Sequence, residues 1–271
     1  NLFKICHDIL TRLSFMANEW LILSNSVIPM YGHASVRRSI VCYYHYSEVH
    51  KYGNIENLTA FRYPFDPYFQ EGASIYTSCH RKGFVDLKES SSKLWGDQCD
   101  SSEFLIEATL KQVSERHVDI SHIILTGDNF RHDDDSDVPV SRDEIYWANT
   151  RLKSLISFYF PYAYIYFCLG NHDVLLHDCL GPGPNLDLQL LKNVWLGDEV
   201  QSNSFDRGGY WSKRISDNLK IISVNTLYYS KKNTLAGSCG DLNGPGWQQL
   251  SWLKNQLFAA LSDNLKVIII G

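Results

Sequence analysis

Side chains that bind cations and transfer protons follow two strongly apolar segments of the sequence. Asp128 comes after a glycine at the end of residues 122–126 (HIILT), and Asn171 and His172 come after another glycine at the end of residues 162–169 (YAYIYFCL). Glycine allows a sharp turn and a close approach of the backbone to an ion. An aspartate there can bridge two divalent cations, an asparagine can give its amide oxygen to one of them, and a histidine can protonate a leaving oxygen. The pattern predicts a two-metal site for phosphoryl transfer, in which a metal-bound water with a pKa of about 7 supplies the nucleophile.

Each of these motifs is ambiguous by itself. Asp128 alone is equally compatible with a helix N-cap or a turn residue. A lone His172 is more often a histidine at the surface or at the edge of the core. Because the two motifs occur together, in the same position after two apolar segments, the chemical interpretation is favoured over both alternatives.

Apolar and amphipathic segments alternate in the second part of the chain, as in an α/β layered protein. Runs rich in β-branched or aromatic residues predict buried strands at residues 122–126, 162–169, 220–225 and 266–270. Apolar residues at helical spacing predict helices at residues 103–117, 141–158 and 247–261. Ser141 and Glu144 form a capping box at the start of the second helix. In such folds the chemistry lies just beyond the carboxyl ends of the strands, which is where Asp128 and Asn171 fall.

The composition argues against several classes of protein. The 271 residues are 44% hydrophobic and 20% charged, which predicts one folded α/β domain rather than disorder. A formal net charge of −5, without clusters of Lys and Arg, gives no footprint for nucleic acid. Polar residues interrupt the most apolar N-terminal stretch, residues 13–30, so that neither a membrane anchor nor a clear signal peptide is evident.

The seven cysteines include no CxxC pair, so a zinc ribbon is not expected. Cys79 and Cys99 flank a polar stretch. They can be bridged, which would indicate an oxidising compartment, or they can be free thiols. Asn57-Leu58-Thr59 is a formal acceptor for N-glycosylation.

Several longer segments resemble a known family. They are DPYFQEGASIYTSCHRKG (66–83), GDQCD (96–100), TGDNFRHDDD (126–135), LGNHDVLLHDCLGPGPNL (169–186), SVNTLYYSKKN (223–233) and GPGWQQLSWL (244–253). Together with the order GD then GNH[DE], they are similar to the calcineurin-like metallophosphoesterase superfamily. Within it they resemble most the endopolyphosphatase and acid-sphingomyelinase-like phosphodiesterase branch. The resemblance extends over residues 61–271.

This resemblance implies a fold, a cofactor and roles for four residues. The fold would be a β-sandwich of mixed sheets flanked by helices, with a divergent segment at residues 1–60 and a catalytic domain at residues 61–271 that is truncated at its C-terminus. The cofactor would be two divalent metal ions (Zn, Mn, Mg or Fe), bridged by Asp128 and bound by Asn171. His172 would be the catalytic histidine, and His132 would lie behind the metal ligands or touch a substrate phosphate.

The resemblance also implies a phosphate-containing substrate and a compartment. Inorganic polyphosphate, cut at its phosphoanhydride bonds by a metal-bound hydroxide, is the expected substrate, and a sphingomyelinase-like phosphodiester is the alternative. A vacuolar, lysosomal or secreted location would fit this branch, as would a disulfide between Cys79 and Cys99.

Two departures from the family pattern favour a third hypothesis. Arg62 and Pro64 stand where the family has the aspartate and histidine of an Asp-x-His motif, and neither side chain ligates a cation. Three further histidine ligands of the family would lie beyond Gly271. On this hypothesis the chain is a non-catalytic pseudo-phosphoesterase with a binding role. On either hypothesis the 271 residues are expected to be inactive alone, because two ligand residues rarely hold a two-metal centre.

The remaining polar residues of the loops are expected to be structural. Arg131 is interpreted as a solvated loop arginine, and residues 133–135 with Asp137 as solvated turn residues. His80 and His177 are expected to serve local loop structure.

Overall fold

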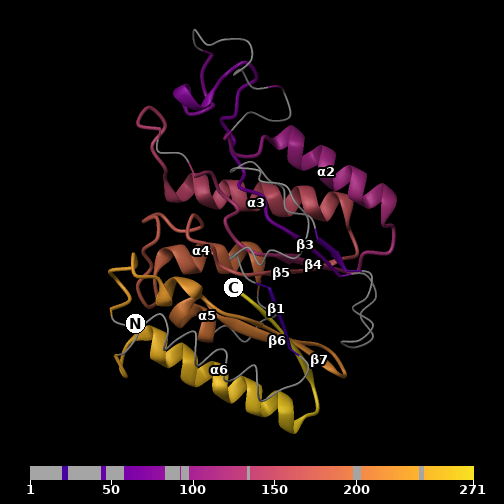
Figure 1. Cartoon of the computed structure of the whole chain (residues 1–271), viewed down its shortest axis with the longest axis vertical. Coiled ribbons are helices and arrows are strands. Elements are labelled where there is room, and N and C mark those ends of the chain that lie inside the picture. Colours follow the sequence, from indigo (N-terminus) through magenta and orange to yellow (C-terminus); the bar gives the residue numbers. More distant parts are fainter. Residues whose placement is uncertain are drawn as a thin grey trace.

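The computed structural model of the chain describes residues 20–23, 44–46, 58–82, 92, 98–132, 135–197, 203–237 and 241–271. Within this part the strands form two four-stranded sheets (Figure 1). The first sheet has the order β2-β3-β4-β5, formed by Tyr44–Tyr46, Leu58–Phe61, His122–Leu125 and Tyr164–Phe167. The second has the order β1-β8-β7-β6, formed by Trp20–Leu23, Lys266–Ile270, Leu219–Ser223 and Trp211–Ser216.

Both sheets mix parallel and antiparallel pairing. In the first sheet β3, β4 and β5 are parallel, and β2 is antiparallel to β3. In the second sheet β1, β8 and β7 are parallel, and β6 is antiparallel to β7. Because parallel strands end at the same edge of a sheet, the segments that follow β3, β4 and β5 emerge side by side.

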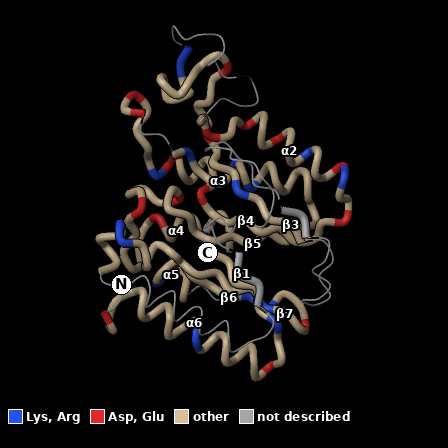
Figure 2. The backbone as a smooth tube through the Cα atoms, viewed as in Figure 1, with Lys and Arg blue, Asp and Glu red and all other residues tan. Residues whose placement is uncertain are grey.

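Helices cover the sheets on their outer sides. Helices α2 (Glu103–Arg116) and α3 (Arg142–Tyr159) lie over the first sheet, and α6 (Pro245–Ser262) lies under the second (Figure 1). Helix α4 (Leu186–Trp195) contacts α3 and β5, and α5 (Asn203–Gly208) contacts α4. Two 3-10 turns, η2 (Ile75–Thr77) and η3 (Thr226–Tyr229), lie in the loops. Figure 2 shows that acidic and basic residues both occur along α2.

The two sides of β7 and β8 face different parts of the core. Ile221 and Ile268 belong to the main cluster of buried side chains, which also contains residues of the first sheet. Ile222 and Ile269 belong to a second cluster with residues of α6. Successive side chains of a strand point to opposite faces, so a strand covered on both faces is apolar throughout. This explains why residues 266–270 read KVIII without alternation.

The predicted α/β fold of mixed sheets flanked by helices is confirmed, as are the four strands and three helices expected in the second part of the chain. Ser141 caps α3 by accepting a hydrogen bond from the Glu144 N–H at 3.3 Å. Strand β6 and helices α4 and α5 were not expected. In β6, Lys213 and Arg214 interrupt the apolar pattern, because this edge strand is only partly buried. The proposed division between residues 1–60 and 61–271 falls within β3, and the separate character of residues 1–60 stays a prediction.

Cys79 and Cys99 form a disulfide with a Cα–Cα distance of 5.9 Å, so the bridged alternative is correct. The bond ties the loop after β3 to the segment before α2. Of the glycosylation tripeptide, Leu58 and Thr59 are buried in β3, and Asn57 lies outside the described residues. No helix in the described ranges is both long and apolar enough to cross a bilayer.

Candidate active site

The site lies at the carboxyl edge of the first sheet. Phe61, Leu125 and Phe167, the last residues of β3, β4 and β5, are in register. The ladder continues one step further, since the Thr126 N–H donates to the Phe61 carbonyl at 3.2 Å and the Cys168 N–H donates to the Leu125 carbonyl at 3.0 Å. The residues that follow these three strands are therefore held against one another by the sheet itself.

The two glycine turns pack directly together. Gly127 has φ +80°, and a Cβ on it would lie 2.8 Å from the Cα of Gly170. A Cβ on Gly170 would lie 2.9 Å from the Cα of Asp128 and would also overlap its backbone nitrogen. Only hydrogen fits at either position, because carbon atoms at these separations overlap. The sequence-based argument for a glycine before each functional segment is thereby given a geometric reason.

Asp173 joins the two turns. Its carboxylate accepts hydrogen bonds from the N–H groups of Asp128 at 3.0 Å, Asn129 at 2.9 Å and Gly170 at 2.8 Å. Burial and the neighbouring Asp128 raise the pKa of Asp173 to about 7, although the three N–H donors favour the carboxylate. Sequence reasoning assigned this residue no role, although it follows His172 directly.

Asp128 is surrounded by donors and positive charge. Its Oδ2 accepts a hydrogen bond from Nη2 of Arg62, its Oδ1 accepts one from the His172 N–H at 3.2 Å, and the Nε2 atom of His132 lies 3.8 Å from Oδ2. Burial by itself would raise the pKa of Asp128, but the His132 ring and the Arg62 guanidinium hold it well below the usual range of an aspartate. Asp128 is therefore ionised at neutral pH.

His132 lies between two carboxylates. Its Nδ1 is 2.8 Å from Oδ1 of Asp100, and the other carboxylate is that of Asp128. Burial lowers the pKa of His132, but Asp100 and Asp128 outweigh burial and raise the pKa to about 9. Asp100 also accepts a hydrogen bond from the His132 N–H. Its role was not expected, because the segment before α2 reaches this edge through long-range contacts: the backbone hydrogen bonds of Ser101 with Pro64 and Asp66, and the disulfide.

The ring of His172 lies close to two other histidine rings. The ring centroid of His132 is 4.1 Å away in an edge-on arrangement, and that of His177 is 3.9 Å away with its ring tilted. Burial and the positive charge of His132 lower the pKa of His172 to about 3. At neutral pH its imidazole is uncharged and can donate its single ring N–H.

Asn171 is held by His177. The Nδ2 atom of Asn171 is 2.8 Å from Nε2 of His177, so the amide donates to the ring and its oxygen is directed elsewhere. The contacts of His177 lie within its own loop, as expected for a local structural role, and they include two of the predicted site residues. The structure therefore brings Asp128, His132 and His172 into one cluster, with Asn171 in the same turn as His172.

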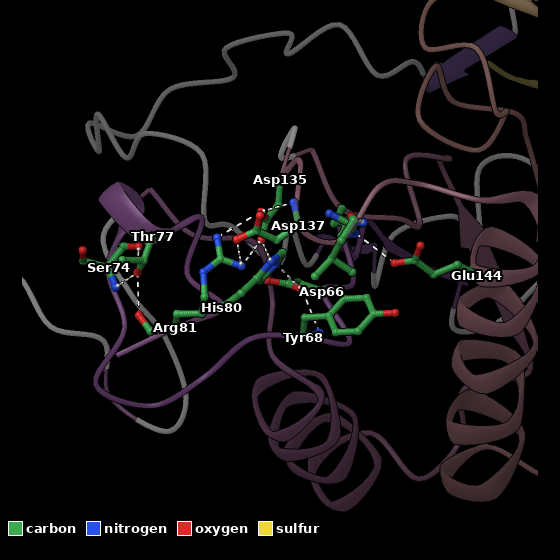
Figure 3. Close-up of polar contacts among 11 residues, drawn as sticks. Asp66, Tyr68, Ser74, Thr77, His80, Arg81, Asp135, Asp137 and Glu144 are labelled. Carbon is green, nitrogen blue, oxygen red and sulfur yellow. Dashed lines mark hydrogen bonds and ion pairs between the residues drawn. The ribbon is translucent and has the colours of Figure 1, made fainter. Parts of the chain in front are cut away.

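A second polar cluster lies beside this edge (Figure 3). His80 is buried between Asp135, 2.7 Å from Nδ1, and Asp66, 3.2 Å from Nε2. Arg81 makes two hydrogen bonds to Asp135, at 2.7 and 3.0 Å. The cluster fixes the disulfide-bonded loop to the segment after β4. The prediction that Asp135 is a solvated turn residue is wrong, because its partners come from a distant loop, while residues 133 and 134 lie outside the described residues.

The prediction for Arg131 is also wrong. Arg131 is not a solvated loop arginine but 1% exposed, and its Nε donates to Glu144 at 3.0 Å. Its guanidinium also packs over the rings of Tyr68 and Phe130. The Glu144 carboxylate therefore forms a salt bridge with Arg131.

Comparison with known proteins identifies the family. The sequence profile of the calcineurin-like phosphoesterases matches residues 44–271. The chain belongs to this family. Endopolyphosphatases are similar to it: that of Schizosaccharomyces pombe is 33% identical over 223 residues, and that of Saccharomyces cerevisiae is 32% identical over 223 residues. Each match covers 76% of this chain, but only 39% and 33% of the respective relative, so the chain spans well under half of their length.

A solved dimetal phosphatase from Danio rerio shares 14% identity, covering 62% of this chain and 59% of that protein, with a TM-score of 0.35. A likeness of this size supports no comparison of the two sites. The family assignment rests on the sequence profile alone.

Calcineurin-like phosphoesterases imply divalent metal ions, and the site does not fit a pair of them. In the described part of the chain, no group of three His, Cys, Asp or Glu side chains is placed to hold a metal ion. The Arg62 guanidinium lies against Asp128, where a bridged ion would have to bind. A divalent ion about 4 Å from a guanidinium is repelled by roughly 8 kcal/mol at an effective dielectric constant of about 20. Pro64, two residues further on, offers no ligand atom in its side chain.

Proposed function

We propose that this chain is part of a phosphoesterase that hydrolyses the phosphoanhydride bonds of inorganic polyphosphate. The observation that carries the proposal is the similarity to endopolyphosphatases of several fungi, at 33% identity over 223 residues for the S. pombe protein. The proposal extends from those relatives to this chain, which covers only part of each.

His172, His132 and Asp128 are the proposed functional side chains. The neutral His172 ring can donate its N–H to the oxygen of a leaving phosphate, and a protonated His132 can donate to a phosphate oxygen beside it. Asp128 keeps His132 protonated and orients the turn that carries His172, through its bond to the His172 N–H. Asn171 supplies an amide oxygen on the same turn, oriented by His177.

The divalent ions of the family would supply a metal-bound nucleophile and neutralise phosphate charge. Asp128 and Asn171 are the proposed ligands, and Zn, Mn, Mg and Fe are the candidate metals. Since the described residues do not fit two ions, the proposed roles above concern only the protein's own groups.

A second candidate function is a relative that binds phosphate without turnover. The contact between Arg62 and Asp128 favours it, because a guanidinium satisfies the carboxylate that would otherwise bind metal. Sphingomyelin-like phosphodiesters are the other substrate class, and sphingomyelin is therefore assayed beside polyphosphate.

A vacuolar, lysosomal or secreted location is proposed on one physical ground. Cys79 and Cys99 form a disulfide. Disulfides persist in oxidising compartments and are rare where thiols are kept reduced.

The proposed activity is tested on the whole protein of which this chain is part, by following the length of long-chain polyphosphate on gels. The protein is supplied in turn with Mg²⁺, Mn²⁺, Zn²⁺ and Fe²⁺, and sphingomyelin and bis(p-nitrophenyl) phosphate are assayed in parallel. Progressive shortening of polyphosphate is expected with at least one ion. His172→Ala should reduce it at least tenfold, while His117→Ala, at the C-terminal end of α2, should not. Absence of shortening with every ion would refute the activity, and turnover of sphingomyelin alone would refute the substrate class.

A further inference from the structure

We propose that the guanidinium of Arg62 takes the place of one cation at this site, and that it binds a phosphate oxygen directly with no metal ion beside it. The inference deepens the proposed function, on which it rests for the substrate class. It concerns how that site holds a phosphate group.

The sheet dictates the position of Arg62. It follows Phe61, the last residue of β3, which is in register with Leu125 of β4. The ladder extends to the Phe61 carbonyl, so Arg62 leaves the sheet next to the turn that carries Asp128.

The contact occupies the carboxylate. Nη2 of Arg62 donates to Oδ2 of Asp128, and the His172 N–H already takes Oδ1 at 3.2 Å. The Asp128 side chain is only 4% exposed. Both oxygens thus have donors, and a positive group already neutralises the buried negative charge, which is the electrostatic role of a metal ion in such a place.

Arg62 retains donors for a ligand. A guanidinium has five N–H groups in a planar fork, which matches the oxygens of a phosphate. Its side chain is 29% exposed, and among the described residues its Nε has no hydrogen-bond partner. A buried donor without a partner is unfavourable. A phosphate oxygen that binds at the exposed part of the guanidinium and reaches Nε would satisfy this donor.

The geometry therefore distinguishes two ways of holding phosphate. In one, metal ions bound to carboxylates and histidines coordinate the phosphate oxygens. In the other, a tethered guanidinium does so, and the affinity for phosphate does not depend on metal. The second predicts that chelation leaves phosphate binding intact on this side of the site.

The experiment is a calorimetric titration of the 271-residue chain with inorganic tripolyphosphate in excess EDTA. Wild type is expected to bind. Arg62→Gln, which keeps an amide donor for Asp128 but loses the charge, should raise Kd at least tenfold, equivalent to about 1.4 kcal/mol. Arg62→Lys, which keeps the charge but loses the fork, should raise Kd several-fold. Arg214→Gln, in the β6–β7 hairpin at the far end of the second sheet, makes the same charge change and should leave Kd unchanged.

A second measurement counts bound Mn²⁺ by equilibrium dialysis. Arg62→Asp, which places a second carboxylate beside Asp128, is expected to bind more Mn²⁺ than wild type. The proposal is overturned if wild type binds two Mn²⁺ ions per chain, if tripolyphosphate binds only when a metal is present, or if Arg62→Gln binds as wild type does. Circular dichroism checks that each variant is folded, and Arg62→Lys decides the matter if Arg62→Gln is not.

These outcomes are separable from those of the activity assay. Tripolyphosphate binding in EDTA without any shortening of polyphosphate would uphold the role of Arg62 and refute the proposed activity. If polyphosphate is shortened but tripolyphosphate binds only when a metal is present, the proposed activity is upheld and the role of Arg62 is refuted.

Discussion

Replacing Gly170 by alanine is expected to separate the two turns that carry the site. The new methyl group would lie 2.9 Å from the Cα of Asp128 and would overlap its backbone nitrogen. The neighbouring atoms belong to the backbone of the second turn, so no side-chain rotation can relieve the overlap. One of the two turns must move.

The cost can be assembled from the contacts that this movement affects. Overpacking a rigid interior typically costs about 1 to 3 kcal/mol. Moving the turns apart also stretches the bonds that Asp173 accepts from Asp128 and Asn129 of the other turn, at 3.0 and 2.9 Å. A hydrogen bond to a charged acceptor contributes about 1.5 to 3 kcal/mol. The loss of one of them brings the expected destabilisation to about 3 to 6 kcal/mol, a large part of the roughly 5 to 15 kcal/mol that stabilise a typical domain.

Urea unfolding followed by circular dichroism measures this effect. With an m-value of up to about 3 kcal/mol/M, the midpoint should fall by at least about 1 M. Gly181→Ala is the matched control, because its methyl group would meet only Leu235, at 3.7 Å, and should shift stability by less than about 0.5 kcal/mol. A Gly170→Ala variant as stable as Gly181→Ala would show that the turns are not packed as described, and the geometric account of the site would fail.

Three other changes have defined outcomes. For His132, the pKa in the folded protein is raised to about 9 from the ordinary histidine value of 6.5. The ion pairs with its two carboxylates therefore contribute fully below about pH 6.5 and are lost as the pH rises through 9. In EDTA the free energy of unfolding should fall over this interval in wild type and change less in His132→Gln; equal slopes would contradict the assignment. Replacing both Cys79 and Cys99 by serine opens a link of sequence separation 20 and should cost about 3 kcal/mol. Dithiothreitol should then lower the melting temperature of wild type but not of this double variant. Asn149→Ala removes the acceptor of the Trp195 indole N–H, which lies 2.9 Å from Oδ1, and should cost about 1 to 3 kcal/mol in urea unfolding; no change would mean that the indole finds another acceptor.

The local sequence was sufficient for the elements that carry the site. Residues 122–126 and 266–270 are apolar because their strands are covered on both faces, and such runs are visible without a structure. The glycines at positions 127 and 170 marked the turns, since a turn that packs against backbone excludes every larger residue. These features depend on neighbours in the chain or on burial alone.

Partners that come from distant segments could not be predicted. Arg131 and Asp135 were expected in solvent because their neighbours in sequence are polar, yet each is buried against a side chain from another segment, Glu144 and His80 respectively. For His177 the sequence predicted a role in its own loop, but not that its partner would be Asn171.

The sequence by itself determined the fold class, the strands that end at the site, and the kinds of side chain placed there. Its resemblance to the family also implied that Arg62 stands in place of an aspartate. Only the tertiary structure decided what that replacement does, because parallel pairing of β3 with β4 brings the guanidinium onto Asp128. The sequence specifies which residue types are present. Which charged group lies next to the Asp128 carboxylate depends on how the strands pair, and no local sequence pattern encodes that pairing.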